Sequence, residues 1–318
     1  MKSYAPLGLH SFLMGNSDID SALGLGIDAG GTQTRWALAD RAGTIVAEGI
    51  VAGLSALQMA TPAGRDAVRA ELRALTADVL ASGRPRRVCA GLTGFGGDGA
   101  LLTTWLADAL AIAPAAVSLS NDIEIAYLDS FPPGAGYLVY AGTGSIAAFI
   151  DEHGELHRAG GRGVTLDDGG GGFWIAKEAM RRIWRLEDEQ PGAWRDSPMA
   201  CAVFDFVGGS DWQHSRQFIY GGDRGAVGKL ALAVARSAEA DQAARTILQQ
   251  AGRELARLAQ ALVARFGPRP IVLAGRAAAL HPLIAETMRA TLSPDLPLRQ
   301  KTAQPHYAAA RIAAQAEH

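Results

Sequence analysis

The fold is decided by the stretch Leu25-Gly-Ile-Asp-Ala-Gly-Gly-Thr-Gln-Thr-Arg-Trp-Ala-Leu-Ala-Asp40, which reads as a strand, a glycine-threonine turn, a second strand and a polar turn. The same plan recurs in Tyr137-Leu-Val-Tyr-Ala-Gly-Thr-Gly-Ser-Ile-Ala-Ala-Phe-Ile-Asp151. A shift of 111 positions superposes Gly31 on Gly142 and the hydroxyl of Thr34 on that of Ser145. The sequence therefore predicts an internal duplication.

Both turns have the composition of a phosphate-binding loop. Glycine can adopt positive φ and has no Cβ, so backbone N–H groups can approach an anion, and neighbouring hydroxyls add donors. Two such turns facing each other would bind successive phosphates of one nucleotide. A glycine turn can also simply close a hairpin, but the repeat with matching flanks favours binding. The expected phosphate ligands are Gly30, Gly31, Thr32, Thr34, Gly142, Thr143, Gly144 and Ser145.

Two better-known phosphate loops do not fit. The run Gly24-Leu-Gly-Ile-Asp-Ala29 matches the dinucleotide fingerprint formally, but it continues into a second strand where that fingerprint requires a helix. A Walker A loop needs Ser or Thr after Gly-Lys, and Gly228-Lys229 is followed by Leu230.

Composition limits the partners. The chain has 318 residues, 48% of them hydrophobic, which is enough for two ordinary cores. Its net charge of −2 without basic runs argues against nucleic acid or an anionic membrane and favours small molecules. No apolar run approaches the roughly 20 residues that span a bilayer, so a cytoplasmic protein is expected. Cys89 and Cys201 suggest neither a disulfide framework nor a cysteine metal cluster.

The chain alternates strands and helices, which predicts an α/β architecture with mostly parallel sheets and a cleft between two halves. Residues 1–22 read as a disordered tail. Residues 23–121, with a C-terminal helix of about 303–318, form the first half, and 122–302 form the second, with a helical insertion over roughly 178–265. Helices are expected at 63–82, 97–112, 123–128, 173–184, 278–291 and 305–314, and further strands at 86–92, 116–121, 270–274 and near 296–298.

Two aspartates stand where chemistry is expected. Asp28 lies two residues before the first glycine pair on an apolar strand, so it could hold Mg²⁺ or merely bond its own turn. Asp122 follows a strand and opens a helix. It could be the N-cap, or it could accept the proton of a substrate hydroxyl that attacks a γ-phosphate. The spacing alone leaves these alternatives open.

Two further segments suggest close backbone approach to a ligand. The run Gly160-Gly-Arg-Gly-Val-Thr-Leu-Asp-Asp-Gly-Gly-Gly-Gly172 combines seven glycines with two aspartates directly before an apolar helix. A mobile surface loop is the alternative. The strand Ile271-Val-Leu-Ala274 ends in the small-residue turn Gly275-Arg276-Ala277, against which a flat base could lie.

Together these residues resemble the N-acetylglucosamine kinases and BadF/BadG/BcrA/BcrD-type ATPases of the actin and hexokinase superfamily, over nearly the whole chain. The resemblance implies two duplicated ribonuclease H-like (actin-like ATPase) domains. It implies that Asp28 and the two hairpins hold Mg-ATP, that Asp122 is the base and that Ala274, Gly275 and Arg276 contact the nucleotide base. Sugar contacts are implied for Ser55, Asn121, Gly160, Gly161, Arg162, Asp167 and Asp168.

Departures from the family pattern fall on the sugar side. Arg162 replaces a tryptophan, Asp168 a glutamate, and Leu57 stands where animal members have asparagine. Arg162 would suit an acidic substrate or a solvated rim. The resemblance implies an ATP-dependent kinase of an amino sugar, N-acetylglucosamine or glucosamine first, with ATP and Mg²⁺ as cofactors. Many members are dimers, so it also allows a homodimer.

Two alternative functions remain open on the sequence. One is an activator ATPase that drives electron transfer to a partner reductase or dehydratase, although such relatives bind an iron-sulfur cluster through cysteines unlike Cys89 and Cys201. The other is a sugar- or nucleotide-binding sensor that has lost catalysis.

Overall fold

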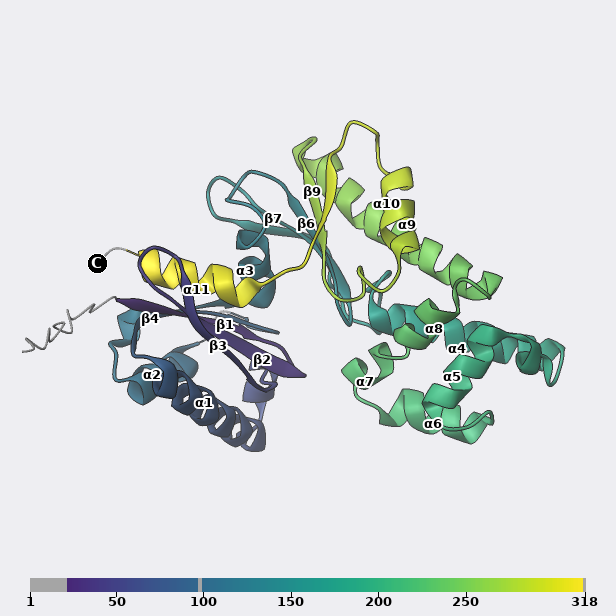
Figure 1. Ribbon diagram of the computed structural model, residues 1–318, viewed down its shortest axis with the longest axis horizontal. Helices are drawn as coiled ribbons and strands as arrows, with labels where there is room; N and C mark the ends of the chain where they lie inside the picture. The colour runs from purple at the N-terminus through teal and green to yellow at the C-terminus, as the bar shows by residue number, and fades with distance from the viewer. Residues whose placement is uncertain (1–21, 97–98, 317–318) are drawn as a thin grey trace, which may run out of the picture.

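Two five-stranded mixed sheets form the centre of the computed structural model, which describes residues 22–96 and 99–316 (Figure 1). The first sheet has the order β3-β2-β1-β4-β5 and the second β8-β7-β6-β9-β10. In the first sheet, β1, β2 and β3 are antiparallel, and β4 and β5 continue the sheet parallel to β1. In the second sheet, β6, β7 and β8 are antiparallel, and β9 and β10 continue it parallel to β6. The bounds are β1 Leu23–Ala29, β2 Gln33–Ala39, β3 Ile45–Ala52, β4 Pro85–Leu92, β5 Val117–Asn121, β6 Tyr137–Ala141, β7 Ser145–Ile150, β8 Leu156–Gly160, β9 Ile271–Ala274 and β10 Leu298–Lys301. This shared topology confirms the duplicated α/β fold.

The two hairpins differ in length by one residue. The last ladder pair before the turn is Ala29 with Thr34 in the first half and Ala141 with Ser145 in the second. The first turn therefore contains one residue more than the second. The strands after the two turns therefore superpose with a residue offset of 111, whereas the strands before them superpose with an offset of 112. With this offset, the structural counterpart of Asp28 is Tyr140.

Helices cover both faces of the first sheet. Alternate β1 residues, including Leu25 and Ile27, pack with leucines of α1 (Pro62–Ser82) and α2 (Ala100–Leu110). The predicted helix of 97–112 is thus shorter at both ends, although residues 97 and 98 lie outside the described part. The opposite face carries α11 (Pro305–Gln315), as Figure 1 shows above the sheet. Asp28 lies on this second face because it alternates with Ile27.

The contact between β1 and α11 depends on two glycines. A methyl group on Gly26 would collide with the backbone carbonyl of His306 and the backbone nitrogen of Ala310, and one on Gly24 would collide with the backbone at Ala314. Gly24 and Gly26, which match the dinucleotide fingerprint in sequence, therefore allow α11 to lie directly on β1.

The second half has its own, larger core. Seven helices belong to it: α4 (Gly172–Glu189), α5 (Pro198–Val207), α6 (Trp212–Gly221), α7 (Arg224–Gly228), α8 (Ala231–Ser237), α9 (Gln242–Phe266) and α10 (Pro282–Thr291). The leucines of α9 pack on the second sheet beside Tyr137 and Phe149. The helix expected from residue 278 begins only at Pro282, because the preceding residues form turns and the His281 side chain caps the helix. None of the helices in the described residues is long and apolar enough to cross a membrane.

The chain crosses between the halves twice: at α3 (Asp122–Leu128) and at the segment between β10 and α11. Contacts of α3 bring these two crossings together. Ile125 of α3 packs against Cys89 and Ala309, whereas Tyr127 belongs to the core of the second half. At the end of α3, the Asp129 carboxylate pairs with the Lys301 Nζ at 2.9 Å and accepts a hydrogen bond from the Gln304 N–H at 3.1 Å. The two crossing segments are thereby tied to one helix.

The glycine contact with α11 gives a stability test. We expect Gly26→Ala to lower the free energy of unfolding by about 2 kcal/mol, because the methyl group meets backbone that can move only with the whole helix. Gly221→Ala is the matched control, since a methyl group there meets nothing within 4 Å. Urea unfolding measures both, and equal stability of the two variants would contradict the packing of α11 on β1.

Candidate active site

The first glycine turn is supported from behind by backbone. The Gly30 N–H donates to the Gln33 carbonyl at 3.1 Å, which closes the turn and leaves Gly31 and Thr32 exposed. A methyl group on Gly53 would lie only 2.5 Å from the Gly31 carbonyl oxygen and from the Thr32 carbonyl carbon. The segment after β3 thus presses its main chain against the turn, whose outer side is free for a ligand.

The second turn is joined to the start of α4. The Gly172 N–H donates to the Gly142 carbonyl at 2.9 Å, and the Phe173 N–H donates to the Thr143 carbonyl at 3.0 Å. A methyl group on Gly171 would lie 2.6 Å from the Gly144 carbonyl carbon. The glycine-rich loop therefore ends by fixing the second hairpin.

Two hydroxyls that the sequence assigned to phosphate binding are buried. The Thr34 Oγ1 is inaccessible and accepts a hydrogen bond from the Leu54 N–H at 3.2 Å. The Ser145 hydroxyl donates to the Gly169 carbonyl at 2.7 Å. The two hydroxyls occupy equivalent positions in the two halves. Each one bonds to a neighbouring loop and holds that loop against its hairpin, which is a structural role.

The short helix α7 lies between the two hairpins. A methyl group on Gly225 would lie 3.0 Å from the Thr32 hydroxyl, and one on Gly228 would lie 3.5 Å from the Thr143 methyl group. Three residues of helix span roughly 4.5 Å. Both hairpins therefore meet at a single helical turn, as expected if they act on one small ligand.

A pair of carboxylates lies next to the hairpins. Burial raises the pKa of Asp28 to about 6, with a further contribution from the negative charge of Asp122, while the positive charge of Arg35 lowers it. Burial also raises the pKa of Asp122, against the hydrogen bonds that it accepts. The charge of Asp122 is close enough to contribute to the raised pKa of Asp28. Both residues lie on the face of the first sheet that carries α11, since a methyl group on Gly91 of β4 would lie 3.1 Å from the Asp122 Cα.

Asp122 is oriented by its neighbours and is not the helix cap. Asn121 caps α3, because its Oδ1 accepts a hydrogen bond from the Ile123 N–H, and Asp122 is the first helical residue. The Thr93 hydroxyl donates to the Asp122 Oδ2 at 2.5 Å, and the Ile123 N–H also donates to the Asp122 Oδ1 at 2.9 Å. Thr93 is a site residue that the sequence analysis missed, since nothing in its local sequence marks it.

Ser55 and Asn121 connect the loops around Asp122. The Ser55 hydroxyl donates to the Thr93 carbonyl at 2.9 Å, and the Asn121 Nδ2 donates to the Phe95 carbonyl at 3.3 Å. Leu57 is exposed and its side chain lies against Gly94. These residues shape the surface beside the candidate base.

The two adjacent aspartates of the glycine-rich loop face in different directions. Asp168 is buried with φ of +59°, its Oδ1 accepts a hydrogen bond from the Gly163 N–H at 3.1 Å, and its Oδ2 lies against Gly144. Burial raises its pKa. Asp167 instead pairs with Arg257 of α9 at 3.0 Å. A buried carboxylate on a strained backbone beside a hairpin is a candidate ligand group.

The remaining predicted sugar-side residues line the start of this loop. Gly160 and Gly161 have φ of +72° and +64°, and methyl groups there would meet Leu258 and Ile146. The Gly161 N–H donates to the Ser145 carbonyl at 3.0 Å. Arg162 is exposed.

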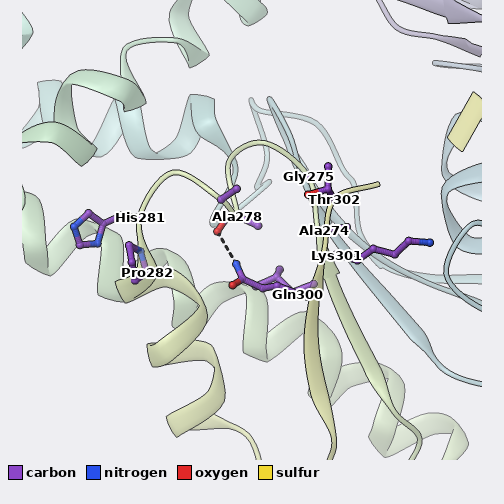
Figure 2. Close-up of a pocket in the computed structure, with 10 residues that line it drawn as sticks. Ala274, Gly275, Ala278, His281, Pro282, Gln300, Lys301 and Thr302 are labelled. Carbon is purple, nitrogen blue, oxygen red and sulfur yellow. Dashed lines mark hydrogen bonds between the residues drawn. The ribbon is translucent and has the colours of Figure 1, made fainter. Parts of the chain in front are cut away.

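The predicted base-binding turn borders a cavity of about 310 Å³ (Figure 2). Gly275 has φ of +100°. A methyl group there would collide with the backbone of Ala141, the last residue of β6 before the second glycine turn. Gln300 closes one side of the cavity, where its Nε2 donates to the Ala278 carbonyl at 3.3 Å. The lining includes Ala274, Gly275, Ala278, Gln300, Lys301 and Thr302. Arg276, the next residue along the chain after Gly275, is exposed.

A duplicated sheet of this topology, with a glycine hairpin on each half, defines the actin-like ATPase class. Within that class, the chain belongs to the BadF/BadG/BcrA/BcrD ATPase family, whose model matches residues 25–311. No curated protein matches the chain.

Solved structures agree with this class. A provisionally named N-acetylglucosamine kinase from Chromobacterium violaceum is 26% identical, with a TM-score of 0.70, over 92% of this chain and 99% of that chain. Another from Porphyromonas gingivalis is 17% identical, with a TM-score of 0.69, over 89% and 96%. A ROK family glucokinase from Streptomyces griseus, in complex with glucose and AMPPNP, is 17% identical, with a TM-score of 0.59, over 92% and 97%. The latter two show the fold alone.

The support of the first hairpin by Gly53 can be tested. We expect Gly53→Ala to raise the Kd for ATP about tenfold or more, because the methyl group pushes the Gly31 backbone out of place. Calorimetric titration with ATP measures the effect, and Gly221→Ala again serves as the control. Unchanged affinity in a folded Gly53→Ala protein would show that this hairpin does not bind the nucleotide.

Proposed function

We propose that the protein is an ATP-dependent sugar kinase that transfers the γ-phosphoryl group to a hydroxyl of an amino sugar, with N-acetylglucosamine as the first candidate. The observation that carries the proposal is Asp122, a partly buried carboxylate held by Thr93 beside Asp28 and the hairpins. The likeness to the Chromobacterium violaceum protein supports it.

The nucleotide has a natural orientation in this site. Gly30 to Thr32 and Gly142 to Gly144 would bind the phosphates through backbone N–H groups. The cavity at Ala274 and Gly275 would take the base, because these residues, with Ala278 and Ala279, give part of its lining small side chains. The cavity adjoins the end of β6, which leads directly into the second hairpin, so base and phosphates would follow one strand.

Asp28 fits a magnesium site. Its pKa is raised by burial and by a neighbouring carboxylate, so a divalent cation would offset an unfavourable concentration of negative charge. Bound there, Mg²⁺ would supply positive charge against the phosphate oxygens. The carboxylate oxygens of Asp28 would hold the ion directly or through water.

Asp122 would act as the general base. The acceptor hydroxyl would give its proton to the Asp122 carboxylate as its oxygen forms a bond to the γ-phosphorus, and the bond from that phosphorus to the β-phosphate oxygen would break to release ADP. The raised pKa makes Asp122 a stronger base than an ordinary aspartate. The hydrogen bond from Thr93 fixes the orientation of the carboxylate.

The acceptor would lie between Asp122 and the glycine-rich loop. Asp168 is the carboxylate of that loop that faces the second hairpin, so we assign sugar binding to Asp168 in preference to Asp167. Arg162 is exposed and free to meet a more acidic sugar derivative. Since the reaction consumes ATP, we expect the protein to act in the cytoplasm.

The placement of the cysteines favours this function over an activator ATPase. Cys89 is buried in a cluster with Ile125, Ala309 and Ala313, and Cys201 lies on α5 in the helical insertion. The chain has only these two. They belong to different halves and offer no common cluster site.

The role of Asp122 gives a direct test. We expect Asp122→Asn to fold and bind ATP with wild-type affinity, while kcat falls by about 10²- to 10⁴-fold, because the amide cannot accept the proton. Asp167→Asn is the control, since it removes a carboxylate that faces Arg257. Undiminished turnover in Asp122→Asn would exclude Asp122 as the base.

The substrate itself can be identified by ATP consumption over a panel of hexoses, amino sugars, uronic acids and muramic derivatives. Selective, sugar-dependent ADP release with an N-acetylated amino sugar is the expected result. Sugar-independent hydrolysis would favour an activator ATPase, and sugar binding without hydrolysis would favour a sensor.

A further inference from the structure

Tyr140 occupies the position in the second half that corresponds to the position of Asp28 in the first half. The register makes them counterparts, each one residue before the final ladder pair of its hairpin. The Tyr140 ring lies against the second turn, with its Cε1 3.4 Å from the place of a methyl group on Gly142. In the sheet, the Tyr140 backbone is the ladder partner of Ala274, at the end of β9.

The phenol lies among charges from both halves. Burial, followed by the negative charges of Asp28 and Asp122, raises the pKa of Tyr140 to about 12, while Arg276 and Arg35 act in the opposite direction. A tyrosine hydroxyl with an ordinary pKa of about 10 already keeps its proton at neutral pH and is available as a hydrogen-bond donor. Such a donor lies within electrostatic range of both the candidate magnesium ligand and the candidate base.

The Tyr140 hydroxyl differs from those of the other tyrosines in this core. The Tyr127 hydroxyl donates to the Gly136 carbonyl at 3.0 Å, and the Tyr137 hydroxyl donates to the Gly267 carbonyl at 2.6 Å. Within residues 22–96 and 99–316, no hydrogen bond satisfies the hydroxyl of Tyr140, whose side chain is only partly buried. Packing alone would be served equally well by phenylalanine.

We propose that the Tyr140 hydroxyl donates a hydrogen bond to an oxygen of the terminal phosphoryl group of ATP. The assignment rests on the proposed function, because a group in transfer must lie between the metal at Asp28 and the base at Asp122. A neutral donor there adds no charge repulsion to the carboxylates and stabilises the negative oxygens of the phosphoryl group. Tyr140 would thus give the second half its own contact with the reacting atoms.

The experiment compares Tyr140→Phe with Tyr137→Phe, which removes the same atom from the same strand at a hydroxyl that bonds to Gly267. Calorimetry with Mg·AMPPNP and Mg·ADP gives the affinities, and kcat and KM are measured with the sugar that the panel selects. We expect Tyr140→Phe to bind AMPPNP about tenfold more weakly and ADP unchanged, because only the triphosphate reaches the hydroxyl. The value of kcat should fall by about tenfold or more, with the KM for the sugar unchanged.

The outcomes separate this inference from the proposed function. If Tyr140→Phe keeps the wild-type ratio of AMPPNP to ADP affinity and the wild-type kcat, the assignment of Tyr140 is wrong and the kinase proposal stands. If the wild-type protein phosphorylates no sugar but Tyr140→Phe loses affinity for AMPPNP alone, the contact is supported and the kinase proposal fails. Equal losses for both nucleotides, or in Tyr137→Phe, would show a structural role only.

Discussion

Direct contact between main-chain segments, without intervening side chains, is the constraint on which the site depends. Gly53 lies against Gly31, Gly171 against Gly144, and Gly275 against Ala141. In each case, a side chain would separate two loops that must touch. The N–H groups of the hairpins are therefore held by neighbouring backbone, which cannot change rotamer, and their direction is fixed before any ligand binds.

Much of the fold could be predicted because its signals are local and repeated. The glycine-threonine turns, the apolar strands and the alternation of strands with helices fix the class and the order of elements. Helix boundaries were harder to predict where two adjacent residues could both serve as the N-cap. Asn121 and Asp122 can both cap a helix, and only the backbone shows that Asn121 does so. The one-residue difference between the turns is visible only in the strand register.

The sequence singled out Asp28 and Asp122 as candidate site residues but left two roles open for each. In the structure, the negative charge of Asp122 contributes to the raised pKa of Asp28, so the two carboxylates lie in one region. The sequence could not show that the hydroxyls of Thr34 and Ser145 point into the protein, since a hydroxyl serves phosphate and backbone equally well. Thr93 was missed because nothing in its local sequence marks it. Tyr140 was missed because it lies in an apolar strand, where a tyrosine is expected to be a core residue.

The helix α3 joins the two halves and also carries Asp122 at its first residue. At its other end, Asp129 is bonded to Lys301 and Gln304, so both chain crossings converge on one rigid rod seven residues long. Any rotation of one half against the other must pivot close to this rod. Asp122 would then move little when the two halves rotate, whereas the loops farther from the helix would be displaced more.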